Sequence, residues 1–315
     1  MSAGSGPAAL PPERVHLRRS PASWVKQGGL SKLLFLLPLL LIFGLFSWYP
    51  IVHLVIMSLQ QTNFVQPAKW VGLANFSEVL HDPLFPIALR NTAEFAGLAL
   101  IFGYPIPLVI AVLISETRKR RGLYSALAYL PVVIPPAVGV LLWKFFYSAG
   151  PNGTFNTILH WVGIAPQQFI QSQTQGIPSL VLYSTWANAG STVIIYLAAL
   201  VGVNRELYEA ASVDGAGLWK KVWHVTMPQL RTVMLVTMIL QIIGTAQVFI
   251  EPWLFTQGGP ANATLTVMLL IYDYAFGNSL GAAYGEAAAL SVMLVAFLAV
   301  FSLIYLRATR SWSTQ

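Results

Sequence analysis

Four uncharged polar residues lie within two otherwise apolar stretches, and their spacing places them on common helix faces. Asn188 and Ser191 are three residues apart, and Gln241 and Thr245 are four apart. Residues at these spacings are neighbours on a helix surface. Amide and hydroxyl groups placed in this way either bind a polar ligand or hydrogen-bond a neighbouring helix, an interaction that contributes about 0.6 kcal/mol in a membrane. The spacing alone leaves both chemistries open.

The composition favours a membrane protein over a soluble one. Of the 315 residues, 56% are apolar and only 9% are charged, and the mean hydropathy is +0.65. Soluble globular domains carry about 25% charged residues, so a soluble enzyme and a disordered chain are excluded. The sequence contains no Cys, which rules out disulfides, thiolate metal sites and cysteine nucleophiles. We predict no metal site.

Six apolar stretches are long enough to cross a bilayer, which requires about 20 helical residues. We predict spans at about 33–57, 93–114, 123–147, 179–200, 232–253 and 287–306. A shorter apolar stretch, 265–276, contains Asp273 and is predicted to be re-entrant or interfacial. Prolines inside the first three spans are expected to kink them. The expected fold class is therefore an all-α polytopic membrane protein with six transmembrane helices.

Basic residues mark one side of the membrane. Fifteen of the 18 Lys and Arg residues lie in the tail 1–32, in the loops after the second and fourth spans, and in the tail 307–315. Positive charge accumulates on the cytoplasmic side, so both termini and the loop 201–231 are predicted to be cytoplasmic. The net charge of +7 is then a sign of topology. The lipid bilayer is an expected partner, and nucleic acid is not.

The loop 201–231 is predicted to form two short helices separated by a turn. Arg205–Val213 contains strong helix formers, and Asp214-Gly215 should end that helix because Gly accepts a positive φ. A second helix is predicted at 218–225, with Pro228 preventing uninterrupted continuation into the fifth span. An amphipathic hairpin of this kind either inserts into a groove on a cytoplasmic partner or rests on lipid headgroups.

The same loop resembles the EAA loop of bacterial ATP-binding-cassette importer permeases. The matching pattern is Glu209-Ala-Ala-x-x-Asp-Gly-Ala-x-x-x-x-x-Val-x-x-Val-x-Met-Pro228. Met227 and Thr232 depart from it, since Leu and a second proline are usual there. Further segments resemble the maltose-type carbohydrate permeases: Leu37-Pro38, Trp48-Tyr49-Pro50, 70–76, Asn91-Thr92, 256–260 and 272–276.

This resemblance implies a type I importer permease fold and a set of partners. The pathway would be formed with a second permease subunit, two ATPase subunits would bind the cytoplasmic loops, and an extracytoplasmic or lipid-anchored binding protein would deliver a saccharide. The chain lacks a G-x-x-x-x-G-K-[ST] motif, so ATP and Mg²⁺ are expected in the ATPases. The chain itself is expected to hold no cofactor, to have no enzyme activity, and to lie in the bacterial inner membrane. The resemblance assigns ATPase coupling to Glu209, Ala210, Ala211, Asp214, Gly215 and Pro228.

The resemblance also implies which residues touch the solute. Maltose-type permeases bind sugar from the two helices that flank the EAA loop. Aligned on that loop and on Gly258-Gly259-Pro260, the contact positions fall on Ala187, Asn188, Ser191, Gln241, Gly244, Thr245 and Val248. A buried anion would need a cation nearby, and no Lys or Arg lies near a span centre. A neutral saccharide is therefore favoured over glycerol phosphate or another polar solute.

Charged residues near span ends, and two other classes of function, stay open. Glu94, Lys144 and Glu251 are expected to snorkel or to form an ion pair at the interface. An ion-coupled secondary transporter would need carboxylates or a His relay near mid-span, and the sequence has none there. A membrane scaffold would use the loop to recruit a cytoplasmic protein and would need no ligand pathway.

Overall fold

The computed structural model describes residues 29–63, 67–117, 119–277 and 283–313. The predictions made for the tail before residue 29, for Arg118 and for the last two residues fall outside this range. The chain divides into two compact units, Met1–His53 and Leu54–Gln315. Each is described below by itself.

The first unit is, within its described range, an apolar helix. It comprises α2 (Gly29–Phe43), the π-helical turn η1 (Gly44–Trp48) and the beginning of α3 (Tyr49–Ser58). Together these form the apolar helix Leu34–Ser58, which carries the first predicted span. Its large side chains, such as Phe35 and Phe46, are exposed. A helix that is apolar on all sides requires lipid or protein around it.

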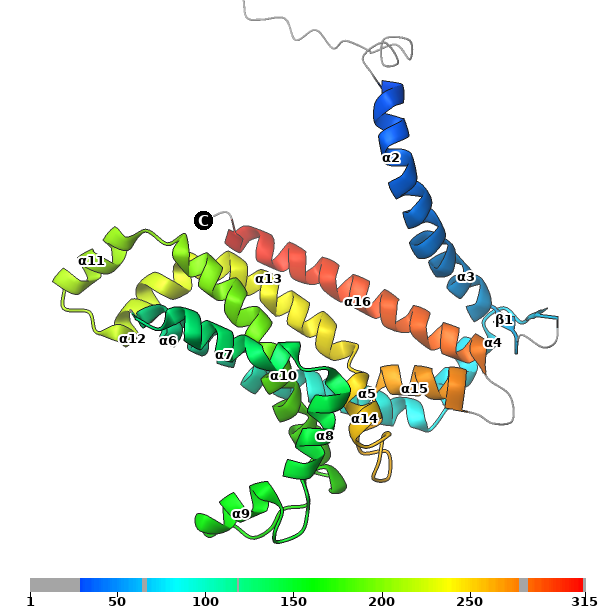
Figure 1. Ribbon diagram of the computed structural model, residues 1–315. Coiled ribbons are helices and arrows are strands. Elements are labelled where there is room, and N and C mark those ends of the chain that lie inside the picture. Colours follow the sequence, from blue (N-terminus) through cyan, green and yellow to red (C-terminus); the bar gives the residue numbers. More distant parts are fainter. Residues whose placement is uncertain (1–28, 64–66, 118, 278–282, 314–315) are drawn as a thin grey trace, which may run out of the picture. The chain divides into compact units, whose positions relative to one another are not determined.

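The second unit is a helical bundle with one small hairpin (Figure 1). The hairpin pairs β1 (Gln60–Gln61) with β2 (Lys69–Trp70) in antiparallel register, Gln60 opposite Trp70. The remaining elements are, in order, α4 (Ala74–His81), α5 (Leu84–Leu98), η2 (Ala99–Gly103), α6 (Pro105–Glu116), α7 (Arg121–Val133), α8 (Pro136–Phe146), α9 (Thr154–Trp161), η3 (Phe169–Gln171), α10 (Gly176–Val201), α11 (Arg205–Val213), α12 (Leu218–Lys221), η4 (Val222–Thr226), α13 (Met227–Ala246), α14 (Ile250–Phe255), α15 (Val267–Tyr272), η5 (Asp273–Gly277) and α16 (Tyr284–Ser313).

The described helices confirm an all-α fold with five or six apolar spans. Five are long enough to cross a membrane: Leu34–Ser58, Leu84–Glu116, Gly176–Val201, Leu218–Phe255 and Tyr284–Arg310. The third predicted span is broken instead of kinked, because α7 and α8 meet at 95°. Pro135 and Pro136 follow Ile134, which takes an extended conformation with ψ of 125°. The residue before a proline is disfavoured in the helical region, which accounts for the break.

Three π-helical turns each precede a proline that the helix accommodates. η1, η2 and η4 are followed, two residues after their last residue, by Pro50, Pro105 and Pro228. Proline lacks an N–H and its ring clashes with the carbonyl four residues earlier. A wider turn shifts the hydrogen bonding to the carbonyl five residues back, as from Met227 N–H to Val222 O. The prediction that Pro228 interrupts the helix was therefore wrong, since α12, η4 and α13 follow one another without a break from Leu218 to Ala246.

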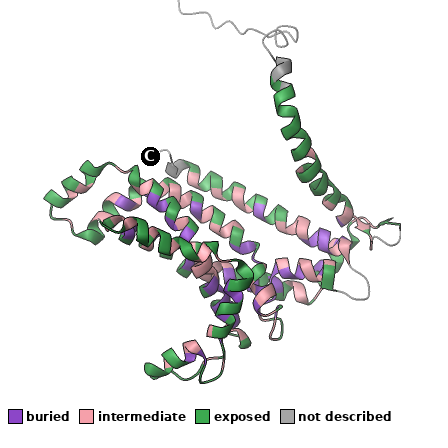
Figure 2. Cartoon of the chain, viewed as in Figure 1, coloured by how far each residue is buried: buried purple, intermediate pink, exposed green. Residues whose placement is uncertain are grey.

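Helix α10 lies at the centre of the second unit. It packs against α5, α6, α7 and α13, and Figure 2 shows buried residues gathered along it. Gly190 permits a close approach to α7, because a Cβ there would lie 2.9 Å from Tyr129 Cα and closer still to the carbonyl oxygen of Ala128. The backbones of α10 and α7 thus touch directly.

The short apolar segment predicted at 265–276 belongs to the core. It forms α15 and η5, and Leu269 and Leu270 are almost fully buried. Asn91 on α5 donates to the carbonyls of Asn262 (2.8 Å) and Leu265 (3.0 Å). These bonds fasten the loop before α15 to the second span.

Candidate functional site

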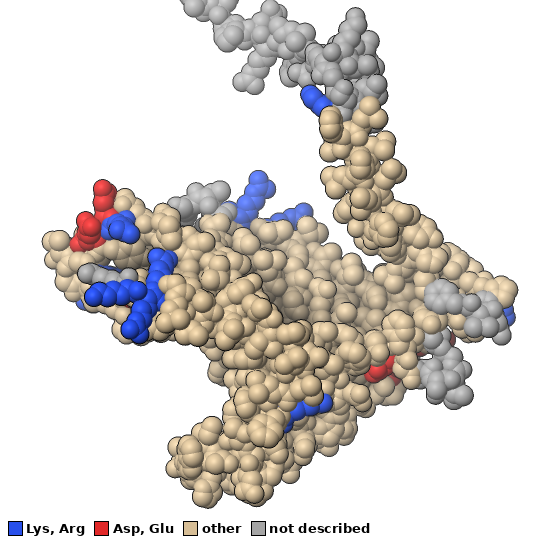
Figure 3. Space-filling view, viewed as in Figure 1, with Lys and Arg blue, Asp and Glu red and all other residues tan. Residues whose placement is uncertain are grey.

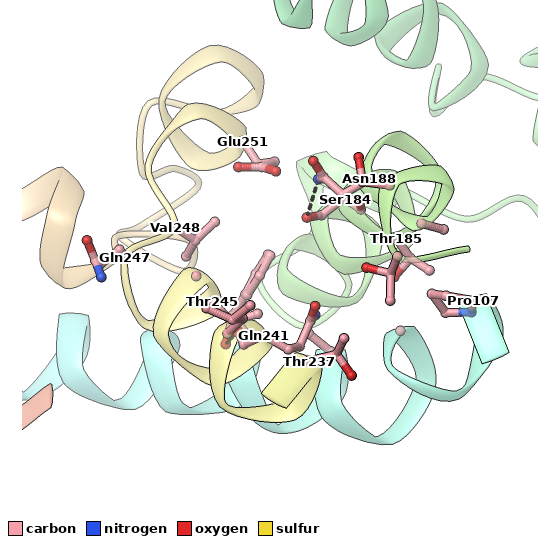
Figure 4. Close-up of a pocket in the computed structure, with 18 of the residues that line it drawn as sticks. Pro107, Ser184, Thr185, Asn188, Thr237, Gln241, Thr245, Gln247, Val248 and Glu251 are labelled. Carbon is pink, nitrogen blue, oxygen red and sulfur yellow. Dashed lines mark hydrogen bonds between the residues drawn. The ribbon is translucent and has the colours of Figure 1, made fainter. Parts of the chain in front are cut away.

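A cavity of about 430 Å³ lies between α10 and α13, with α14 at one end (Figure 4). Six of the seven residues predicted to touch a solute line it: Asn188, Ser191, Gln241, Gly244, Thr245 and Val248. Pro107 of α6 and Phe95 of α5 also contribute to its walls. The helices α10 and α13 therefore present polar residues to one space, although their lining residues, such as Ser191 and Gln241, lie far apart in the sequence.

The α10 wall carries amide and hydroxyl groups. Asn188 and Ser191 are exposed to the cavity. Asn188 Nδ2 donates to the Ser184 carbonyl (2.9 Å) and lies 3.4 Å from the Ser184 hydroxyl oxygen. Both contacts stay within α10, so the Asn188 side chain is not used to hold a neighbouring helix. Ser184 also lines the cavity; it was not predicted, although it lies one helical turn before Asn188.

The α13 wall combines polar groups with free space. Thr245 is buried and donates to the Gln241 carbonyl at 2.9 Å. A Cβ built on Gly244 would meet no atom within 4 Å, so this glycine leaves open space beside Gln241 and Thr245. Gln247 also lines the cavity. The helix ends at Ala246, which turns Gln247 away from the regular helical periodicity.

Ala187 is the one predicted contact that the structure places elsewhere. It packs against a cluster of buried aromatic and aliphatic side chains that includes Trp143 and Tyr183. Phe95 and Val248 belong to the same cluster and also line the cavity. These two cluster residues give the cavity an apolar wall. Ala187 packs against the cluster and does not line the cavity.

Glu251 also lines the cavity. The chain leaves helical geometry at Phe249 (φ −134°, ψ −50°) and resumes as α14 at Ile250. This break brings Glu251 to the cavity wall, where its side chain faces Ser184 (Figure 4). Lys144 is not among the described residues that line the cavity with Glu251.

The loop between the fourth and fifth spans forms a separate polar surface. α11 covers the predicted range Arg205–Val213 and begins at Asn204, whose side chain accepts from Glu206 N at 3.0 Å. Gly215 ends it with a φ of +74°. The second predicted helix is not a separate element, because α12 and η4 run on into α13.

Five of the six residues predicted for coupling lie on α11 and the turn that follows it, and the sixth, Pro228, lies in the first turn of α13. Glu209, Ala210 and Asp214 are exposed and Ala211 is half-buried. Charged side chains gather at this end of the second unit (Figure 3). Within the described residues, no group of three or more His, Cys, Asp or Glu is arranged to hold a metal ion.

Residues 103–311 match the family described as binding-protein-dependent transport system inner membrane component. Over 289 residues the chain is 32% identical to the arabinooligosaccharides transport system permease protein AraP of Bacillus subtilis, covering 90% of this chain and 89% of that protein. It is 33% identical to the lactose transport system permease protein LacF of Rhizobium radiobacter over 282 residues, covering 88% and 93%.

The fold is similar to that of solved transporter chains. One belongs to a bacterial ABC transporter involved in import of the acidic polysaccharide alginate, with a TM-score of 0.78 and 27% identity, covering 91% of this chain and 97% of that one. Another is from the alginate transporter in complex with a periplasmic protein bound to alginate pentasaccharide, with a TM-score of 0.79 and 26% identity, covering the same shares.

Proposed function

This chain belongs to the family of binding-protein-dependent transport system inner membrane components, and we propose that it is the permease subunit of an ATP-driven sugar importer. In this proposal a saccharide is delivered by an extracytoplasmic binding protein and crosses the bacterial cytoplasmic membrane by alternating access. The observation that carries the proposal is the cavity between α10 and α13, where Asn188, Ser191, Gln241 and Thr245 meet.

The cavity has the chemistry that a saccharide requires. Binding pockets for small molecules typically measure 300–1,000 Å³ and combine apolar walls with a few placed polar groups, and this cavity measures about 430 Å³. Sugar hydroxyls would exchange hydrogen bonds with Asn188 and Gln241. The apolar face of a sugar ring would pack on Phe95 and Val248, which line the same space.

We assign ATPase coupling to the loop between α10 and α13. α11 projects exposed side chains, including Glu209 and Asp214, and a short helix of this kind suits a groove on a partner protein. The positive φ of Gly215 sets the turn that returns the chain to α12. The coupling residues in this proposal are Glu209, Ala210, Ala211, Asp214, Gly215 and Pro228.

Three kinds of protein partner complete the transporter in this proposal. A second permease subunit shares the pathway, two ATPase subunits bind ATP and Mg²⁺, and the binding protein docks on the outer face. This chain carries no phosphate-binding loop motif, so the energy comes from the ATPases. Transport is then a two-state equilibrium of the permease pair that nucleotide and solute bias.

We propose that both termini and the coupling loop face the cytoplasm. Lys and Arg side chains gather at one end of the second unit (Figure 3), and Lys119, Arg120 and Lys220 are exposed. Positive charge is concentrated on the cytoplasmic side of membrane proteins, which supports this orientation.

Membrane vesicles containing the assembled transporter and its binding protein test the proposal. Uptake of labelled arabinotriose, lactose and maltose is measured with and without ATP on the cytoplasmic side, and with an ionophore. We expect uptake of a saccharide that requires ATP and survives the ionophore. Uptake that persists without ATP and collapses with the ionophore would identify an ion-coupled transporter. Binding of ATPase subunits without uptake of any saccharide would favour a scaffold.

A further inference from the structure

Glu251 is the one ionisable side chain among the described residues that line the cavity, and none of them is Lys, Arg or His. From the sequence we expected this carboxylate to snorkel or to form an ion pair at the interface. The roles proposed above for the coupling loop and for the amide side chains do not explain why an acidic residue lines the cavity. Placing a charge inside a membrane protein is costly. A carboxylate at this position therefore suggests that it has a function in the cavity.

The geometry presents the carboxylate beside the polar wall of α10. The break at Phe249 places Glu251 in the first turn of α14, and its side chain faces Ser184 (Figure 4). The Ser184 hydroxyl oxygen lies 3.4 Å from Asn188 Nδ2, and Glu251 lines the same cavity as these two residues. Glu251, Ser184 and Asn188 thus form a polar strip along one side of the cavity.

The chemistry of this strip distinguishes between classes of saccharide. An ionised carboxylate only accepts hydrogen bonds, and bonds to it are about twice as strong as those between neutral groups. Adjacent sugar hydroxyls are matching donors. A ligand carboxylate offers no donor and would meet a like charge in a space with no described cation. Like charges within a few ångströms repel strongly when water is scarce.

We propose that Glu251 is a specificity-determining residue of this permease, which accepts hydrogen bonds from hydroxyls of a neutral saccharide and excludes saccharides that carry a carboxylate. This inference rests on the proposed sugar-import function and narrows its substrate class. The similar transporter of known structure is involved in import of an acidic polysaccharide. Transporters of this fold can therefore differ in whether their saccharide is neutral or acidic.

Direct binding to the assembled transporter, without its binding protein, isolates the selectivity of the permease. The permease pair with its ATPases is placed in lipid nanodiscs. The ligands are lactose and maltose, each paired with the derivative in which a C6 hydroxymethyl group is oxidised to a carboxylate. Dissociation constants are measured by equilibrium dialysis for wild type, Glu251→Gln, Glu251→Asp and Glu116→Gln. Glu116 is an exposed carboxylate at the end of α6 outside the cavity, so it controls for the change in charge.

We expect the wild type and Glu116→Gln to bind the neutral sugar and to reject its acidic derivative by at least about tenfold. Glu251→Gln should bind the acidic derivative about tenfold more tightly than wild type does and the neutral sugar more weakly. Equal discrimination in wild type and Glu251→Gln would overturn the proposal.

A second variant and the uptake assay decide the cases in which Glu251→Gln alone is uninformative. If Glu251→Gln does not assemble with its partners, Glu251→Asp decides alone: weaker binding of the neutral sugar with the acidic derivative still rejected supports the proposal, and unchanged neutral binding overturns it. Failure of the proposed function is visible separately, because the wild type would then show no ATP-dependent uptake of any saccharide in vesicles.

Discussion

The hydroxyl of Tyr208 lies 3.0 Å from the hydroxyl of Thr226, and this hydrogen bond joins α11 to the π-helical turn η4. Thr226 is 3% exposed, so the contact reaches from the exposed loop into the packed interior. η4 runs directly into α13, which carries Gln241 and Thr245. A movement of α11 can therefore be transmitted through η4 and α13 to the cavity wall.

Tyr208→Phe should weaken the coupling of ATP hydrolysis to transport. It removes one hydrogen bond, with a net contribution of about 0.5–1.5 kcal/mol, and keeps the ring. We expect normal assembly and a several-fold fall in sugar transported per ATP hydrolysed, measured in proteoliposomes. Tyr124→Phe is the matched control, because Tyr124 is an exposed tyrosine on α7. An unchanged ratio in Tyr208→Phe would show that the bond carries no coupling.

Glu209→Lys should reduce binding of the ATPase subunits. Glu209 is exposed on α11, and a reversed charge would enter the partner groove in this account. Pull-down in detergent with a tagged permease measures the ATPase recovered, and we expect a clear loss together with loss of transport. Glu116→Lys provides the same charge change on α6, outside the loop. ATPase recovery equal to that of wild type would contradict the assignment.

Asn188→Ala should lower transport while assembly stays normal. The Asn188 hydrogen bonds in the structure are to Ser184 on the same helix, so helix packing does not depend on them. Loss of a hydrogen bond to the solute should reduce uptake about tenfold, since an unpaired polar group costs about 1–3 kcal/mol. Uptake in vesicles and subunit recovery are measured beside Asn152→Ala, an exposed asparagine outside the cavity. Loss of assembly would instead indicate a structural role.

Asn91→Ala should destabilise the permease itself. The variant removes the donor to the carbonyls of Asn262 and Leu265. The Asn262 carbonyl still accepts from Leu265 N–H, whereas the Leu265 carbonyl loses its side-chain donor, and a buried carbonyl left unpaired costs about 1–3 kcal/mol. We expect a lower unfolding temperature of the purified assembly, followed by intrinsic fluorescence. The same exposed control, Asn152→Ala, should leave it unchanged. Equal unfolding temperatures would mean that the loop before α15 is held by other contacts.

The sequence predicted the fold class and the family because both depend on long or specific patterns. Apolar stretches of sufficient length leave few alternatives in a bilayer, and the all-α polytopic permease fold is confirmed. The bounds of α11 were predicted as well, since Asn204 and Gly215 supply the signals that start and end a helix.

The errors come from features that depend on three-dimensional context. Pro228 was expected to break the helix, but the π-helical turn η4 accommodates it by shifting the backbone hydrogen bonds. The position of Glu251 could not be predicted from spacing, because it follows a non-helical residue, Phe249, that interrupts the periodicity. Ala187 was assigned by alignment alone and stays a prediction; in the structure it packs against the cluster that includes Trp143 and Tyr183.

Protection of a single thiol in the cavity tests the central claim, that the solute passes between α10 and α13. The chain contains no Cys, so Ser191→Cys gives the permease one thiol at the cavity wall, and Ser148→Cys gives an exposed control outside it. Labelling by a small maleimide is followed on the permease band, with and without the transported sugar. We predict that the sugar slows labelling of Ser191→Cys and leaves Ser148→Cys unaffected. Equal labelling of Ser191→Cys with and without a sugar that the transporter imports would contradict the account.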